Sequence, residues 1–125
     1  MRKMSPKTMR RKALALWSIL VRHRDGNACL VCKSAEYIQA HHIEDKRNES
    51  LRYALANGAS LCARHHFGGS DSAHHSPVYF LDWLQTNRPY QLVYVRQHRT
   101  DKPESLADAY ARLQSLDFKR TTGQQ

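Results

Sequence analysis

The spacing of apolar side chains predicts helices near both ends of the 125-residue chain. The first series at helical spacing consists of Leu16, Trp17, Leu20 and Val21. Ser5-Pro6 precedes it, and serine followed by proline is typical of an N-cap and a first helical position. Asp25-Gly26-Asn27 is a turn signal that ends this helix.

Three further helices are expected in the second half of the chain. Ser76-Pro77 repeats the N-cap-and-proline signal ahead of Phe80, Leu81 and Leu84. Residues 89–98 are ambiguous because Leu92–Val95 has strand propensity, but the helical spacing is favoured. Residues 103–117 form the last predicted helix.

Between these helical regions the pattern becomes alternating, which is typical of strands. Tyr37–Ile43 reads as one strand and Ala59–Leu61 as a short second one, after the turn signal Asn57-Gly58. Residues 44–56 are polar and form a loop, and a short helix begins near Ala63. Helices around a small antiparallel pair of strands predict an α+β fold.

The charge of the chain indicates a polyanionic partner. The formal net charge is +9 and the isoelectric point is about 9.8, a balance for which nucleic acid is the commonest partner. Residues 1–12 contain six basic residues and no acidic one, so they are expected to form a basic N-terminal tail that either contacts phosphates or is simply solvated. A single domain over 13–118 and a flexible C-terminal tail over 119–125 complete the expected organisation.

No apolar run is long enough to span a bilayer, and the basic N-terminus lacks the apolar stretch of a signal peptide. We therefore expect a cytoplasmic protein without membrane contact. Disulfides are rare in a reducing compartment, so the three cysteines among eight histidines indicate a metal.

The cysteines have the spacing of a structural zinc site. Cys29 and Cys32 form C-x-x-C, and thirty residues later Cys62 and His65 form C-x-x-H. Two such turns can supply four ligands to one tetrahedral Zn²⁺. Buried unpaired cysteines and a redox C-x-x-C are the alternatives, but the pattern uses every cysteine in the chain.

Histidines and an asparagine lie in register with this pattern. His41-His42 is on the predicted first strand, Asn57 begins the second, and His66 directly follows His65. This order resembles the HNH, or ββα-metal, nucleases, and the resemblance covers about residues 24–85. It implies a ββα-metal finger with a structural zinc, surrounded by helices, in a small free-standing domain of the phage type. His65 stands where the commonest pattern has cysteine, and zinc accepts either ligand.

The resemblance implies a role for each residue. Adjacent strand residues point to opposite faces, so His41 and His42 are expected to do different work: His41 binds a catalytic metal and His42 is the general base. His66 is the second metal ligand, and Asn57 bridges the hairpin loop. His74 is the candidate third ligand. Weaker candidates for that position are Asp71 and His75.

The expected reaction is hydrolysis of double-stranded DNA, and the resemblance implies that it leaves 5′-phosphate and 3′-hydroxyl ends. The catalytic divalent metal, Mg, Mn, Ni or Zn, is left open, as is the oligomeric state, and no organic cofactor is expected. Arg47, Arg52 and Arg64 are candidate phosphate contacts. Trp17 and Trp83 are interpreted as core.

Two alternatives remain: a non-catalytic zinc-containing DNA-binding module, and a structural-RNA binder, for which no aromatic RNA-binding motif or GXXG loop is present.

Overall fold

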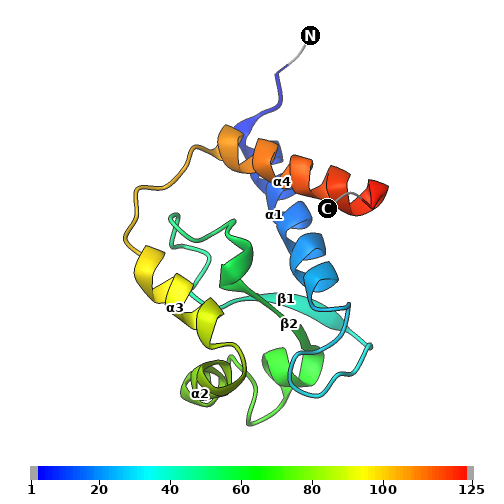
Figure 1. The fold of residues 1–125 in the computed structure, drawn as a ribbon, viewed down its shortest axis with the longest axis vertical. Helices are drawn as coiled ribbons and strands as arrows, with labels where there is room; N and C mark the ends of the chain where they lie inside the picture. The colour runs from blue at the N-terminus through cyan, green and yellow to red at the C-terminus, as the bar shows by residue number, and fades with distance from the viewer. Residues whose placement is uncertain (1–2, 124–125) are drawn as a thin grey trace.

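The computed structural model describes residues 3–123, which form four α-helices around a two-stranded antiparallel hairpin (Figure 1). The predicted α+β class is therefore confirmed. The α-helices are α1 (Pro6–Arg24), α2 (Pro77–Asn87), α3 (Pro89–His98) and α4 (Leu106–Thr122). The strands are β1 (Ile38–His42) and β2 (Gly58–Cys62). The 3₁₀ turn η1 (Leu55–Asn57) precedes β2, and the π-helical turn η2 (Arg64–Gly68) follows it.

The serine–proline signals place two helix starts correctly. Ser5 Oγ accepts a hydrogen bond from the Thr8 amide at 3.2 Å, and α1 begins at Pro6. The helix ends before Gly26, whose φ of 73° is a left-handed conformation that glycine adopts without strain. α2 begins at Pro77 as expected, but the Ser76 side chain makes no capping bond and instead donates to the Ser70 carbonyl at 2.7 Å.

The two expected tails are largely helical. Residues 6–12 form the first turns of α1, and residues 119–122 form the last turn of α4. The apolar face of α1 begins only after these basic positions, which is why the pattern alone assigned them to a tail. Residues 1–2 and 124–125, also assigned to the tails, lie outside the described residues.

The hairpin register sets the direction of every side chain in the site. Ile38 pairs with Cys62, and His42 pairs with Gly58 at the other end. Because strand side chains alternate, one face of the hairpin is turned to α1 and the other to α2. At Gly58 the two layers come into close contact: a Cβ there would overlap with Val21 and lie 2.8 Å from Trp17 Cζ2.

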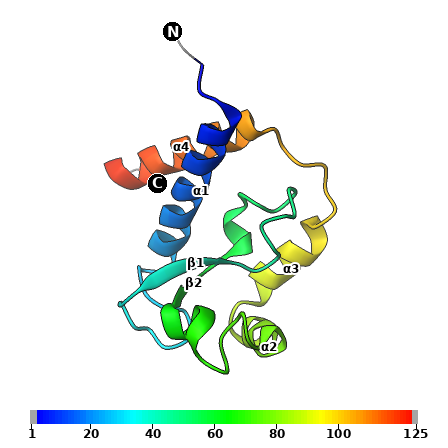
Figure 2. The same cartoon turned by 180° about the vertical axis from the view of Figure 1, so that it is seen from behind.

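The hairpin lies between two pairs of helices, α1 with α4 and α2 with α3 (Figure 2). The core on the α1 and α4 side consists of Ala13, Trp17, Leu20, Val21, Tyr53, Ala109 and Leu113. The core on the α2 and α3 side consists of Cys29, Leu30, Ala59, Leu61, Cys62, Ala73, Phe80, Leu84 and Leu92. No helix within residues 3–123 has both the length and the apolar character needed to cross a membrane.

Candidate metal centres and active site

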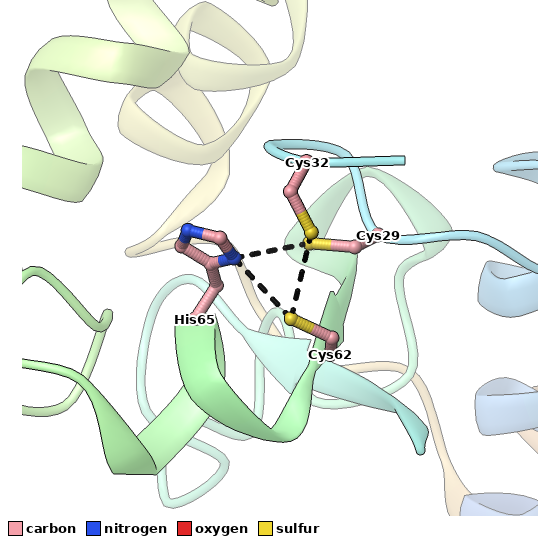
Figure 3. Close-up of side chains that lie close together, drawn as sticks. All are labelled: Cys29, Cys32, Cys62 and His65. Atoms are coloured by element: carbon pink, nitrogen blue, oxygen red, sulfur yellow. Dashed lines mark hydrogen bonds between the residues drawn. The ribbon is translucent and has the colours of Figure 1, made fainter. Parts of the chain in front are cut away.

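Three cysteines and one histidine converge at the end of the hairpin (Figure 3). Cys29 and Cys32 come from the turn after α1, where Lys33 adopts a left-handed φ of 66° and its amide donates to the Cys29 carbonyl at 2.9 Å. Cys62 ends β2, and His65 rises from η2. Their candidate ligand atoms all lie within 4.8 Å of one another.

The distances in this Cys₃His cluster fit one tetrahedral zinc ion. Zn–S bonds of about 2.3 Å and Zn–N bonds of about 2.0 Å place two sulfurs about 3.8 Å apart and a sulfur and a nitrogen about 3.5 Å apart. Cys32 Sγ is 3.7 Å from Cys62 Sγ. His65 Nδ1 is 3.2 Å from Cys62 Sγ and 3.7 Å from Cys29 Sγ. The predicted four residues therefore form a possible structural zinc site.

The surroundings of the cluster favour thiolate at Cys29. Burial raises the pKa of that thiol, but the backbone amides of Cys32, Cys62 and Val31 lower it by more, so that it lies below its ordinary value. Burial raises the pKa of the Cys62 thiol. Since a metal binds the thiolate form, the amide donors around Cys29 prepare this position for a ligand.

Asp71, a weak candidate for the second metal, lies on the zinc side instead. Its Oδ2 is 4.0 Å from His65 Nε2, the ring nitrogen that does not face the sulfurs. This separation is longer than a hydrogen bond, so the carboxylate is only a nearby charge for the His65 ring. The expected phosphate contact Arg64 also faces Asp71, at 3.8 Å, and does not line the cleft described below.

A second cluster consists of His41, His66 and His74, whose ligand nitrogens also lie within 4.8 Å of one another. His41 comes from β1, His66 from η2, and His74 from the loop before α2. Gln39 Oε1 accepts from His66 Nδ1 at 2.5 Å, which leaves His66 Nε2 free of a proton. That nitrogen is 3.1 Å from His74 Nε2, a separation that two ligands of one ion can have at metal–nitrogen bonds of about 2.1 Å.

Two of the three histidines, His41 and His66, are kept neutral by their position. Burial, and then the neighbouring His66 and His74, lower the pKa of His41 to about 3. Burial and then His74 lower the pKa of His66 to about 4. A histidine binds metal only in its neutral form, so both rings are ready to act as ligands at neutral pH. His75, the other weak candidate, is exposed and lies outside the cluster.

The π-helical turn η2 serves both clusters with adjacent residues. His65 belongs to the Cys₃His cluster and His66 to the three-histidine cluster. Their carbonyls accept from the Ala73 and His74 amides at 2.8 and 3.2 Å, and these bonds hold the His74 loop against the turn. Phe67 adds a second support, since its ring stacks on His74 with centroids 4.2 Å apart and planes 7° apart.

His42 points away from this cluster, to the opposite face of β1. Its ring stacks on Trp17 of α1, with centroids 3.8 Å apart and planes 9° apart. His42 Nε2 lies 3.0 Å from the Arg52 carbonyl oxygen. Because a carbonyl only accepts, Nε2 carries the proton and Nδ1 is the basic nitrogen of the neutral ring. Burial, partly opposed by this carbonyl, lowers the pKa of His42.

Asn57 is fully buried and ties together the two ends of the long hairpin loop. Its Oδ1 accepts from the Glu44 amide at 2.7 Å. Its Nδ2 donates to the carbonyls of Glu44 and Leu51 at 2.9 and 3.2 Å. These bonds fix the segment that follows His42, which is the bridging position expected for Asn57.

A cleft of about 550 Å³ brings the two kinds of histidine together. His41, His66 and His74 line it together with His42, and the middle of α1 forms one side. Several further residues position or line the site and were not assigned to it from the sequence, among them Arg11, Trp17, Gln39, Lys46 and Phe67. Only Gln39 carried a local signal, since it shares the alternation of β1 with His41.

The other two candidate arginines lie beside the cleft. Arg47 pairs with Asp45 at 2.9 Å and is exposed. Arg52 donates through Nε to the Lys46 carbonyl at 2.6 Å.

Comparison with protein-family models, with curated proteins and with solved structures finds no match for this chain.

Proposed function

We propose that this protein is a metal-dependent endonuclease of the HNH kind that hydrolyses DNA phosphodiester bonds. One observation carries the proposal: adjacent residues of β1 present different chemistry to one cleft. His41 joins a three-histidine cluster, and His42 is held by a carbonyl with its basic nitrogen unprotonated. A divalent metal and a general base in one cleft are what hydrolysis of a phosphodiester requires.

The three-histidine cluster suits a divalent ion such as Zn, Ni or Mn, and Mg can be held there with help from phosphate oxygens and waters. An ion bound there would stabilise the negative charge on the phosphoryl oxygens and on the leaving oxygen. Three neutral ligands leave the full positive charge of the ion facing the phosphate. Gln39 and Phe67 support this step indirectly, because they orient His66 and His74.

His42 supplies the base. Its Nδ1 takes one proton from a water molecule, whose oxygen attacks phosphorus in line with the 3′ oxygen. The bond from phosphorus to the 3′ oxygen breaks, and the leaving oxygen takes a proton from solvent, giving 5′-phosphate and 3′-hydroxyl ends. The Arg52 carbonyl on Nε2 stabilises the imidazolium formed in this step, and Trp17 holds the ring plane.

The alternative is a non-catalytic zinc-containing DNA-binding module. The net charge of +9 favours DNA binding under either hypothesis. Such a module needs the Cys₃His cluster for folding, but it needs neither the three-histidine cluster nor His42. The two hypotheses therefore differ in whether the chain cuts.

The test is cleavage of supercoiled plasmid with added Mg, Mn, Ni or Zn, comparing the wild type with His42→Gln. Glutamine can still donate to the Arg52 carbonyl but cannot accept the proton, so we expect cleavage to fall by a factor of about 10²–10⁴. His75→Gln is the matched control, because His75 is exposed and outside the cluster, and it should cut like the wild type. If the wild type cuts with none of the ions, the DNA-binding module replaces the nuclease. If His42→Gln cuts like the wild type, His42 is not the base.

A further inference from the structure

A cationic hollow of about 270 Å³ lies between α1 and the long hairpin loop. Five of its lining residues are basic, and no aspartate or glutamate from residues 3–123 lines it. The basic residues are Arg10, Arg11, Lys46, Arg47 and Arg52. Such a concentration of one charge around a small depression attracts an anion.

Most of this charge is not neutralised within the protein. Arg10, Arg11 and Lys46 form no ion pair with a carboxylate in the part of the chain that the structure describes. Arg47 alone of the five is paired, with Asp45. The Arg52 guanidinium is held in place by the Lys46 carbonyl, which accepts from its Nε but adds no negative charge.

The hollow is continuous with the cleft of the candidate active site. Arg11, Leu14 and Lys46 line both. A polyanion whose phosphate lies at the three-histidine cluster therefore meets the hollow as it leaves the cleft along α1. The helix fixes Arg10 and Arg11 on a rigid backbone, so these side chains lose less freedom on binding than they would in a mobile tail.

We infer that the cationic hollow is a second phosphate seat, which binds backbone phosphates of the DNA beside the one that is cut. This inference rests on DNA being the partner, as in the proposed function. It assigns Arg10 and Arg11 of α1, rather than Arg64 near the zinc site, to substrate binding. These contacts reach only phosphates, so they position the strand without reading its sequence.

The double variant Arg10→Gln/Arg11→Gln tests the seat. Each phosphate contact contributes about 0.9 to the slope of log K against log salt, so losing two contacts should reduce the slope by about 1.8. At 0.1 M salt this corresponds to roughly 60-fold weaker binding, relative to a 1 M reference at which electrostatic contacts contribute nothing. The readout is fluorescence anisotropy of a labelled DNA duplex with zinc-loaded protein and no added divalent ion.

The matched control is Lys3→Gln/Lys7→Gln, which removes the same charge from the same segment but at residues that do not line the hollow. We expect the slope of log K against log salt to fall in this control by no more than half as much as it falls in the arginine variant. Equal slopes for the arginine variant and the wild type overturn the seat, and so do equal losses in both variants. Melting curves establish that both variants remain folded.

Binding and cutting fail separately in this design. A reduced slope for the arginine variant together with a wild type that cuts no plasmid supports the seat and removes the nuclease. A wild type that cuts plasmid while both variants keep the full slope supports the nuclease and removes the seat.

Discussion

Replacing Cys62 by serine tests the structural metal site most directly. Cys62 ends β2, lies in the core on the α2 side, and places its sulfur 3.2 Å from His65 Nδ1 and 3.7 Å from Cys32 Sγ. Serine is similar in size but is a poor zinc ligand, so Cys62→Ser removes one corner of the tetrahedron with little change in volume. A closed structural site does not tolerate a missing ligand.

The expected cost is as large as the stability of the whole domain. Zinc binds zinc-finger peptides with an apparent free energy of about 10–16 kcal/mol, and much of this becomes folding free energy. A domain of this size is stable by about 5–15 kcal/mol in total. The cluster also joins the turn after α1 to β2 and η2, so its loss releases several core residues at once, Leu30, Leu61 and Phe80 among them. We therefore expect Cys62→Ser to lose zinc and its cooperative thermal transition together.

The assay combines elemental analysis with melting followed by circular dichroism. Wild type should carry one zinc per chain at the Cys₃His cluster after mild chelation. The control is Ser60→Ala on the same strand, because Ser60 Oγ is buried and has no hydrogen-bond partner within the described residues. Removing an unsatisfied hydroxyl should leave the melting temperature unchanged or raise it. Zinc-free wild type that melts cooperatively, or Cys62→Ser that melts like the wild type, would refute the reasoning.

Two further predictions concern the supports of the site. Asn57→Ala removes three hydrogen bonds from a fully buried position, and at about 1 kcal/mol each the free energy of unfolding in urea should fall by about 3 kcal/mol; a loss well below 1 kcal/mol contradicts the bridging role. Phe67→Ala removes the ring that stacks on His74, so calorimetry should find Ni²⁺ binding at the three-histidine cluster weakened by up to about tenfold. Phe67→Tyr should restore the affinity, and unchanged affinity in the alanine variant would show that the stack does not position His74.

Much of the secondary structure could be predicted from local patterns. The starts of α1 and α2 and the helix at Pro89 depend on residues close together in sequence. The hairpin and the Cys₃His cluster each combine two local signals that lie further apart along the chain. Prediction from local patterns failed where the apolar periodicity and the helix-capping signal disagreed. The basic residues 6–12 carry no apolar face, so the pattern assigned them to a tail, whereas the N-cap at Ser5 and the packing of the following turns place them in α1.

The opposite directions of His41 and His42 also followed from the sequence, because strand side chains alternate whatever the rest of the chain does. His66 could be paired with His41 through the motif order. The sequence could not show that the third ligand is His74 rather than Asp71 or His75. That choice depends on the backbone hydrogen bonds that hold the loop after η2.

The tertiary structure alone decided what surrounds these residues. Trp17 contacts His42, and Arg11 reaches the cleft, because α1 packs back across the hairpin. Asp71 lies near His65 rather than in the second cluster, with its Oδ2 4.0 Å from His65 Nε2. Residue types, spacing and alternation determine which side chains can serve as ligands or base. Which distant side chains contact these ligands and this base depends on how the helices pack over the hairpin. The apolar periodicity of a helix does not indicate which element it packs against.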